Sequence, residues 1–108
     1  MLTIGALAIA TPSQALEPGV TVITQVRELA GTPYLAVRVL NDSETSLRAR
    51  VEAPVVTDVK TVEAGKNAYW SIRLGRGVPL SGEGEVTIQQ FVDGTLEKET
   101  VTFEYDAN

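Results

Sequence analysis

The chain of 108 residues has room for one domain, with 44% of its residues hydrophobic and 21% charged. It contains no cysteine and no histidine, which excludes disulfides, a thiolate nucleophile, Cys/His zinc sites and an imidazole base. Fourteen acidic residues against nine basic ones give a formal charge of −5, so we expect no nucleic-acid partner, because phosphates require a basic surface.

The first fifteen residues differ in kind from the rest. Residues 2–10 form an uncharged, mostly apolar run that is too short to span a membrane but has the length of a signal-peptide hydrophobic region. Pro12 ends the run, and Ser13 and Ala15 place small residues at the −3 and −1 positions of a cleavage site. No Lys or Arg precedes the run, which is atypical of signal peptides.

We therefore predict a signal-peptide remnant at residues 1–15 and one mature domain over residues 16–108. This organisation predicts a secreted or cell-surface protein with no membrane span after the signal is removed. The alternative is that residues 2–10 form an ordinary first strand or a buried helical turn.

From residue 20 onward, apolar residues recur at every second position in short segments, which is the spacing of half-buried strands. The clearest case is the alternation of Leu47, Ala49 and Val51 with charged residues. We expect seven strands, within residues 20–27, 34–39, 47–52, 55–62, 68–74, 86–92 and 101–105.

Turn-forming residues separate these segments. They stand at 31–33, 41–43 and 64–67, and Asp93-Gly94 is a strong hairpin signal. The Gly- and Pro-rich residues 75–84 are expected to form a longer surface loop.

The whole pattern, with 14 valines, 12 threonines and no segment of helical period, predicts an all-β protein. Its fold class is an antiparallel β-sandwich of about seven strands, Ig-like or fibronectin-III-like. A small closed barrel is the alternative.

Three segments carry a family resemblance: residues 34–41 (YLAVRVLN), 64–71 (AGKNAYWS) and 105–107 (YDA). They resemble the small Ig-like β-sandwich modules that accompany secreted glycoside hydrolases and other exoenzymes of actinobacteria. The resemblance covers most of residues 19–107, and its motifs consist of turn and core residues. It implies an extracellular, non-catalytic accessory module. No enzyme domain precedes the module in these 108 residues, so the alternative to an accessory module of an enzyme is a free-standing secreted or surface protein that reuses the fold.

Two glutamate pairs are the strongest candidates for catalysis. Glu83 with Glu85, and Glu97 with Glu99, are two positions apart, so each pair projects from one face of a strand about 7 Å apart. That separation suits glycosidic acid/base chemistry. We prefer to interpret them as solvated or edge-protecting residues, because a small sandwich rarely has a large cleft. We therefore expect no catalytic residue and no enzyme.

The turn after residue 40 is rich in oxygen atoms. Asp42 and Glu44 are weak calcium candidates, but calcium usually takes six to eight ligands, and Asn-Asp-Ser is ordinary turn chemistry. We expect neither a metal nor a cofactor.

Aromatic residues are the remaining indication of binding. Tyr69 and Trp70 are adjacent on a strand and so point to opposite faces. Trp70 shares its face with Ile72 and is expected in the core. Tyr69 then points outward with Arg73, and Tyr34 points outward on its own strand. Tyr and Arg are favoured at contact sites, so Tyr34, Tyr69 and Arg73 are the candidate ligand contacts.

These expectations favour a secreted, non-catalytic Ig-like module that binds a surface polysaccharide or a protein partner. The alternative is a structural or assembly component that pairs with another chain through its edge strands.

Overall fold

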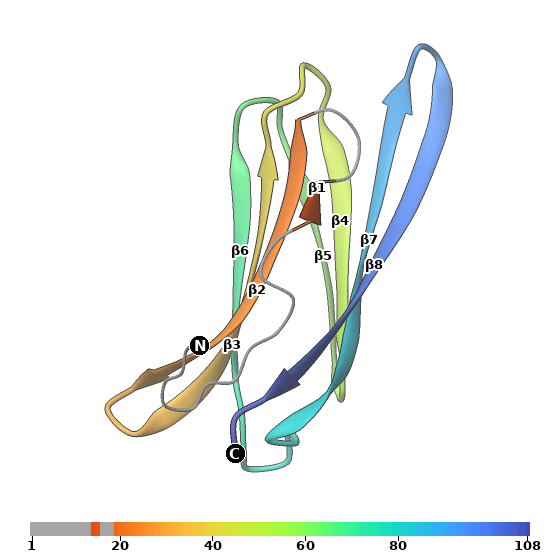
Figure 1. Cartoon of the computed structure of the whole chain (residues 1–108). Helices are drawn as coiled ribbons and strands as arrows, with labels where there is room; N and C mark the ends of the chain where they lie inside the picture. The colour runs from red at the N-terminus through yellow and green to blue at the C-terminus, as the bar shows by residue number, and fades with distance from the viewer. Residues whose placement is uncertain (1–13, 16–18) are drawn as a thin grey trace.

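In the computed structural model, which describes residues 14–15 and 19–108, the chain forms two antiparallel four-stranded sheets (Figure 1). One sheet has the strand order β1-β2-β3-β6, and the other has the order β5-β4-β7-β8. The strands are β1 (Gln14–Ala15), β2 (Val20–Leu29), β3 (Thr32–Asn41), β4 (Leu47–Ala53), β5 (Val56–Val62), β6 (Asn67–Arg73), β7 (Ser81–Val92) and β8 (Thr95–Asp106).

The predicted all-β antiparallel sandwich is confirmed, with seven strands of seven to twelve residues in addition to the two-residue β1. Each sheet is open, so the alternative of a closed barrel is wrong. The β7–β8 hairpin is the longest, and its tip extends away from the neighbouring strands (Figure 1).

The predicted signal segment, residues 1–15, lies outside the described residues except for its last two. Gln14 and Ala15 pair with Val22 and Thr21 of β2. The signal peptide therefore stays a prediction. Within the described ranges, no helix is long and apolar enough to cross a membrane.

The core lies between the two sheets and is built from alternate residues of each strand. In β6, for example, Ala68, Trp70 and Ile72 are buried and their neighbours are exposed, as the sequence predicted. Burying one Val, Leu or Ile side chain contributes about 1.5–3 kcal/mol, and this packing acts without the help of disulfides. The buried cluster comprises Val20, Val22, Leu35, Val37, Val39, Leu47, Ala49, Val51, Val62, Ala68, Trp70, Ile72, Leu74, Val86, Ile88, Val101, Phe103 and Tyr105.

Polar contacts close one side of the sandwich, where β5 and β6 are the edge strands of opposite sheets. The indole Nε1 of Trp70 donates a hydrogen bond of 2.9 Å to Asp58 Oδ2. The Lys60 ammonium lies 5.0 Å from the Trp70 ring centroid and donates to the Tyr69 carbonyl at 2.9 Å. These side chains of β5 therefore bridge to β6 across the sandwich edge.

A buried polar cluster joins the sheets at the end of β3. The side chain of Asn41, which is 0% exposed, donates to the carbonyls of Thr45 (2.9 Å) and Val62 (3.0 Å). Its Oδ1 accepts from the Ser43 amide (3.1 Å) and hydroxyl (2.6 Å). Gln90 of β7 donates to Ser43 Oγ (2.8 Å) and Thr45 O (2.9 Å). The Asn41 side chain thereby links the first sheet to the β3–β4 turn and to β5, and Gln90 links the same turn to β7.

The prediction of a loop over residues 75–84 is wrong for residues 81–84, because β7 begins at Ser81. Gly84 lies opposite Phe103 in the sheet, and a Cβ at Gly84 would lie 2.5 Å from Phe103 Cζ and 2.6 Å from Glu52 O. The glycine leaves space for the aromatic ring of its strand partner, so glycine here belongs to a strand.

Two hairpin turns differ in how well they were predicted. Asp93 and Gly94 have φ of +53° and +80° and form the expected two-residue turn between β7 and β8. The turn expected at residues 31–33 lies earlier, at Ala30 and Gly31, whose φ angles are +53° and +83°. Thr32 is already the first residue of β3.

The Asn41 cluster generates a prediction about stability. Asn41→Ala removes two donated and two accepted hydrogen bonds from a buried site, so we expect the free energy of unfolding to fall by about 3 kcal/mol. Asn67→Ala is the matched control, because Asn67 is an exposed asparagine at the start of β6. Its effect should stay within about 0.5 kcal/mol in urea titrations. Equal losses in the two variants would contradict the role of the cluster.

Tyr105 provides a pH-dependent test. Its side chain is 2% exposed, its hydroxyl donates to Pro79 O at 3.0 Å, and burial raises its pKa above the ordinary 10.0. Because the folded state holds this proton more tightly than the unfolded state, stability is fully present below pH 10 and declines as the pH rises further. Tyr105→Phe should therefore lose less stability than the wild type between neutral pH and pH values above 10 in urea titrations. Identical slopes for Tyr105→Phe and the wild type would refute the assignment.

Candidate functional site

The structure brings the three predicted contact residues together on one outer face. Across β3 and β6, Tyr34 lies opposite Arg73, and Arg38 lies opposite Tyr69. On the other side of β3, Arg27 of β2 lies opposite Tyr34. We call these five residues, Arg27, Tyr34, Arg38, Tyr69 and Arg73, the Tyr/Arg face.

A cation–π contact organises the centre of the Tyr/Arg face. The guanidinium carbon of Arg38 lies 5.3 Å from the ring centroid of Tyr69, and the Tyr69 side chain stays 41% exposed. Ala36, which is only 4% exposed, lies on the same face and has no bulk to fill the space above it. A shallow hollow of about 80 Å³ results, lined by Ile23, Gln25, Arg27, Ala36, Arg38 and Tyr69.

The Tyr/Arg face is positively charged although the chain as a whole is negative. It carries three arginines, and within β2, β3 and β6 the only acidic residue is Glu28. Glu28 has the opposite parity to Arg27, so it does not project from this face. A planar guanidinium binds a carboxylate or phosphate with two hydrogen bonds, so this face is suited to an anionic ligand.

The sequence interpretation missed two members of this face. Neither Arg27 nor Arg38 was identified as a contact. Alternation gives the side of a strand on which each residue lies, but it does not give the strand pairing that places Arg27 beside Tyr34. The available signal was that Arg27 and Arg38 each fall at a position that alternation places on the outward side of its strand.

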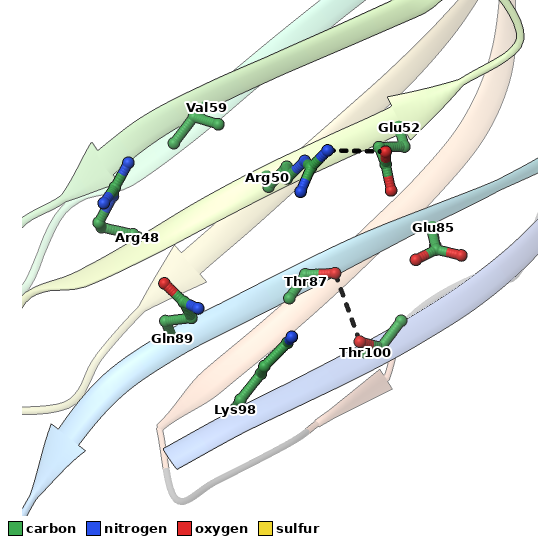
Figure 2. Close-up of a pocket in the computed structure, with 9 residues that line it drawn as sticks. All are labelled: Arg48, Arg50, Glu52, Val59, Glu85, Thr87, Gln89, Lys98 and Thr100. Atoms are coloured by element: carbon green, nitrogen blue, oxygen red, sulfur yellow. Dashed lines mark hydrogen bonds and ion pairs between the residues drawn. The ribbon is translucent and has the colours of Figure 1, made fainter. Parts of the chain in front are cut away.

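The outer face of the second sheet is also hollowed (Figure 2). Arg50 Nη2 forms an ion pair of 3.0 Å with Glu52 Oε2, and the hydroxyls of Thr87 and Thr100 are 3.3 Å apart. The hollow has a volume of about 340 Å³ and is lined by Arg48, Arg50, Glu52, Val59, Glu85, Thr87, Gln89, Lys98 and Thr100.

The two glutamate pairs are separated by the β7–β8 hairpin. Glu85 shares the outer face with Glu52, its direct partner on β4, and Glu83 projects from the same side. On β8, Glu99 lies opposite the buried Ile88 and so has the inward parity. The two pairs therefore lie on opposite faces of one hairpin and do not converge on a common hollow.

The weak calcium candidates Asp42 and Glu44 are both exposed. The neighbouring Asn41 Oδ1 already accepts two hydrogen bonds from Ser43. Within residues 14–15 and 19–108, no group of three or more acidic side chains is arranged to hold a metal ion.

No family model, curated protein or solved structure matches the chain. Function is therefore inferred from the side chains of the two outer faces.

Proposed function

We propose that this protein is a secreted, non-catalytic Ig-like module that binds an acidic surface polysaccharide through the Tyr/Arg face. The observation that carries the proposal is the gathering of three arginines and two tyrosines on a face of β2, β3 and β6 without a carboxylate, in a chain of net charge −5. The signal-like segment at residues 1–15 and the resemblance to extracellular accessory modules support secretion.

The geometry of the face suits an extended polymer. Tyr34 and Tyr69 offer rings for stacking on sugar faces, and Arg27, Arg38 and Arg73 offer guanidinium groups for uronate carboxylates or phosphodiesters. The Arg38–Tyr69 contact holds both side chains in place before the ligand arrives, which reduces the entropy lost on binding. Because no deep pocket encloses the face, successive sugar units could lie along it.

Edge-strand pairing, the alternative function, has less support. On the β5/β6 side, Lys60 already donates to the Tyr69 carbonyl, and a lysine on an edge strand discourages pairing with another chain. Near the hairpin tip, the edge strand β8 carries three consecutive charged residues, Glu97, Lys98 and Glu99, which also discourage pairing with another chain.

Calorimetric titration with a short galacturonate oligosaccharide tests the proposal. A short ligand binds one face at a time, so the affinity is not affected by multivalency. Arg38→Gln should weaken binding by about tenfold, because it removes one charge-assisted contact and the partner of Tyr69. Arg48→Gln is the matched control, since it removes the same charge from the outer face of the other sheet.

The result expected is binding of the acidic oligosaccharide that weakens with salt and is lost in part in Arg38→Gln and in Tyr69→Ala. Equal affinity for a neutral gluco-oligosaccharide would overturn the anionic class of ligand. A loss confined to Arg48→Gln would move the site to the other sheet, and an absence of binding to either sugar would reject polysaccharide in favour of a protein partner.

A further inference from the structure

The outer face of β4, β5, β7 and β8 changes from basic to acidic along the strands. Strand register places its residues in rows, and one row holds Arg48, Gln89 and Lys98. The next row holds Arg50 with the uncharged Thr87 and Thr100, and the row after that begins the acidic end. The acidic end consists of Glu52, Glu83, Glu85, Glu104 and Asp106. We call the whole surface, from the basic row to the acidic end, the bipolar face.

The acidic end contains like charges that face each other directly. Glu52 lies opposite Glu85, and Glu83 lies opposite Glu104. Like charges at opposed positions destabilise a sheet. Of these four, only Glu52 has an ion-pair partner in the described part of the chain. At the other end, Figure 2 shows Arg48 and Lys98 away from any carboxylate drawn, on either side of Gln89.

Apolar features accompany the charges at both ends. Beyond the basic row, Phe91 and Leu96 lie opposite each other near the hairpin tip, and their side chains are 60% and 53% exposed. Beside the acidic end, a hollow of about 350 Å³ is lined in part by Ala53, Pro54 and Gly84. The face therefore has a basic end with a projecting apolar pair and an acidic end with a recess.

We propose that the bipolar face binds the bipolar face of a second copy of this chain, forming a two-fold symmetric dimer. A two-fold axis lying between the copies and running across the strands, at the level of Thr87 and Thr100, reverses the order of the rows. It places the basic row of each copy over the acidic end of the other. It also places the row of Phe91 and Leu96 over the row of Glu83 and Glu104, beside the recess that Glu83 and Pro54 line. An isologous interface requires self-complementarity of this kind.

The size of the face sets the strength of the association. The five rows that overlap about this axis, from that of Phe91 and Leu96 to that of Glu83 and Glu104, span about 27 Å, and four strands span about 19 Å, which gives roughly 500 Å² on each copy. A stable interface buries about 800 Å² on each partner, so we expect a weak dimer with a dissociation constant in the micromolar range or above. Since the two sheets lie back to back, the Tyr/Arg faces of the two copies would both remain accessible.

Sedimentation of the whole chain with charge-reversed variants tests the dimer. Arg48→Glu with Lys98→Glu makes the basic row acidic, and Glu52→Lys with Glu85→Lys makes basic the row that it faces in the other copy. Each double variant should be monomeric alone, with its dissociation constant raised at least tenfold. A 1:1 mixture of the two should dimerise at least as well as the wild type, because each end then meets an opposite charge. Lys66→Glu, in the exposed turn between β5 and β6 and outside both faces, is the control and should dimerise like the wild type.

The wild-type dimer should also dissociate as salt is raised from about 20 mM to about 500 mM. A wild type that stays monomeric at millimolar concentration and low salt would overturn the proposal. So would double variants that dimerise alone like the wild type, or a mixture that remains monomeric while each variant keeps its folded circular dichroism spectrum. A monomeric wild type that binds a basic peptide at the acidic end would assign the face to a different protein instead.

Discussion

The buried amide of Asn41 fixes how the two sheets meet. Its side chain bonds to carbonyls of the β3–β4 turn and of β5, and its backbone exchanges hydrogen bonds of 2.7 and 2.9 Å with Gly65 and Lys66 before β6. In a chain without cysteine, no covalent link could take over this task. Every buried side-chain nitrogen and oxygen in the described ranges has a hydrogen-bond partner, so the polar groups of the cluster are satisfied by protein atoms.

Fixing the sheets also fixes which side chains face outward. The inward residues of β3 and β6 are committed to the core, so Tyr34, Arg38 and Tyr69 must project on the opposite side. The same reasoning applies to β4 and β7, where Arg48 and Glu85 project outward while Val51 and Ile88 are buried. One packed core thereby presents two outer faces of different charge, one uniformly basic and one divided between basic and acidic ends.

Much of this arrangement was predictable from alternation alone. The period of two correctly placed Trp70 in the core and Tyr69 outside, and the Asp93-Gly94 dipeptide correctly located the longest hairpin. Period and turn chemistry are local properties, and a single sequence displays them directly.

The remaining features depend on contacts between distant segments. Gly84 suggested a loop by composition, whereas its place in β7 depends on the ring of Phe103 on the next strand. Val55, expected to begin a strand, lies in the β4–β5 turn with φ of +58°, a conformation that a β-branched residue rarely adopts. The basic character of the Tyr/Arg face likewise depends on pairing β2 with β3, because only that pairing brings Arg27 beside Tyr34.

The two outer faces are proposed to act separately, one on an acidic polysaccharide and one on a second copy of the chain. Amide chemical shifts of isotope-labelled protein test it directly. Adding galacturonate oligosaccharide at low protein concentration should shift amides of β2, β3 and β6, whereas raising the protein concentration without sugar should shift amides of β4, β7 and β8. Shifts confined to the same strands in both titrations would contradict the separation of the two faces.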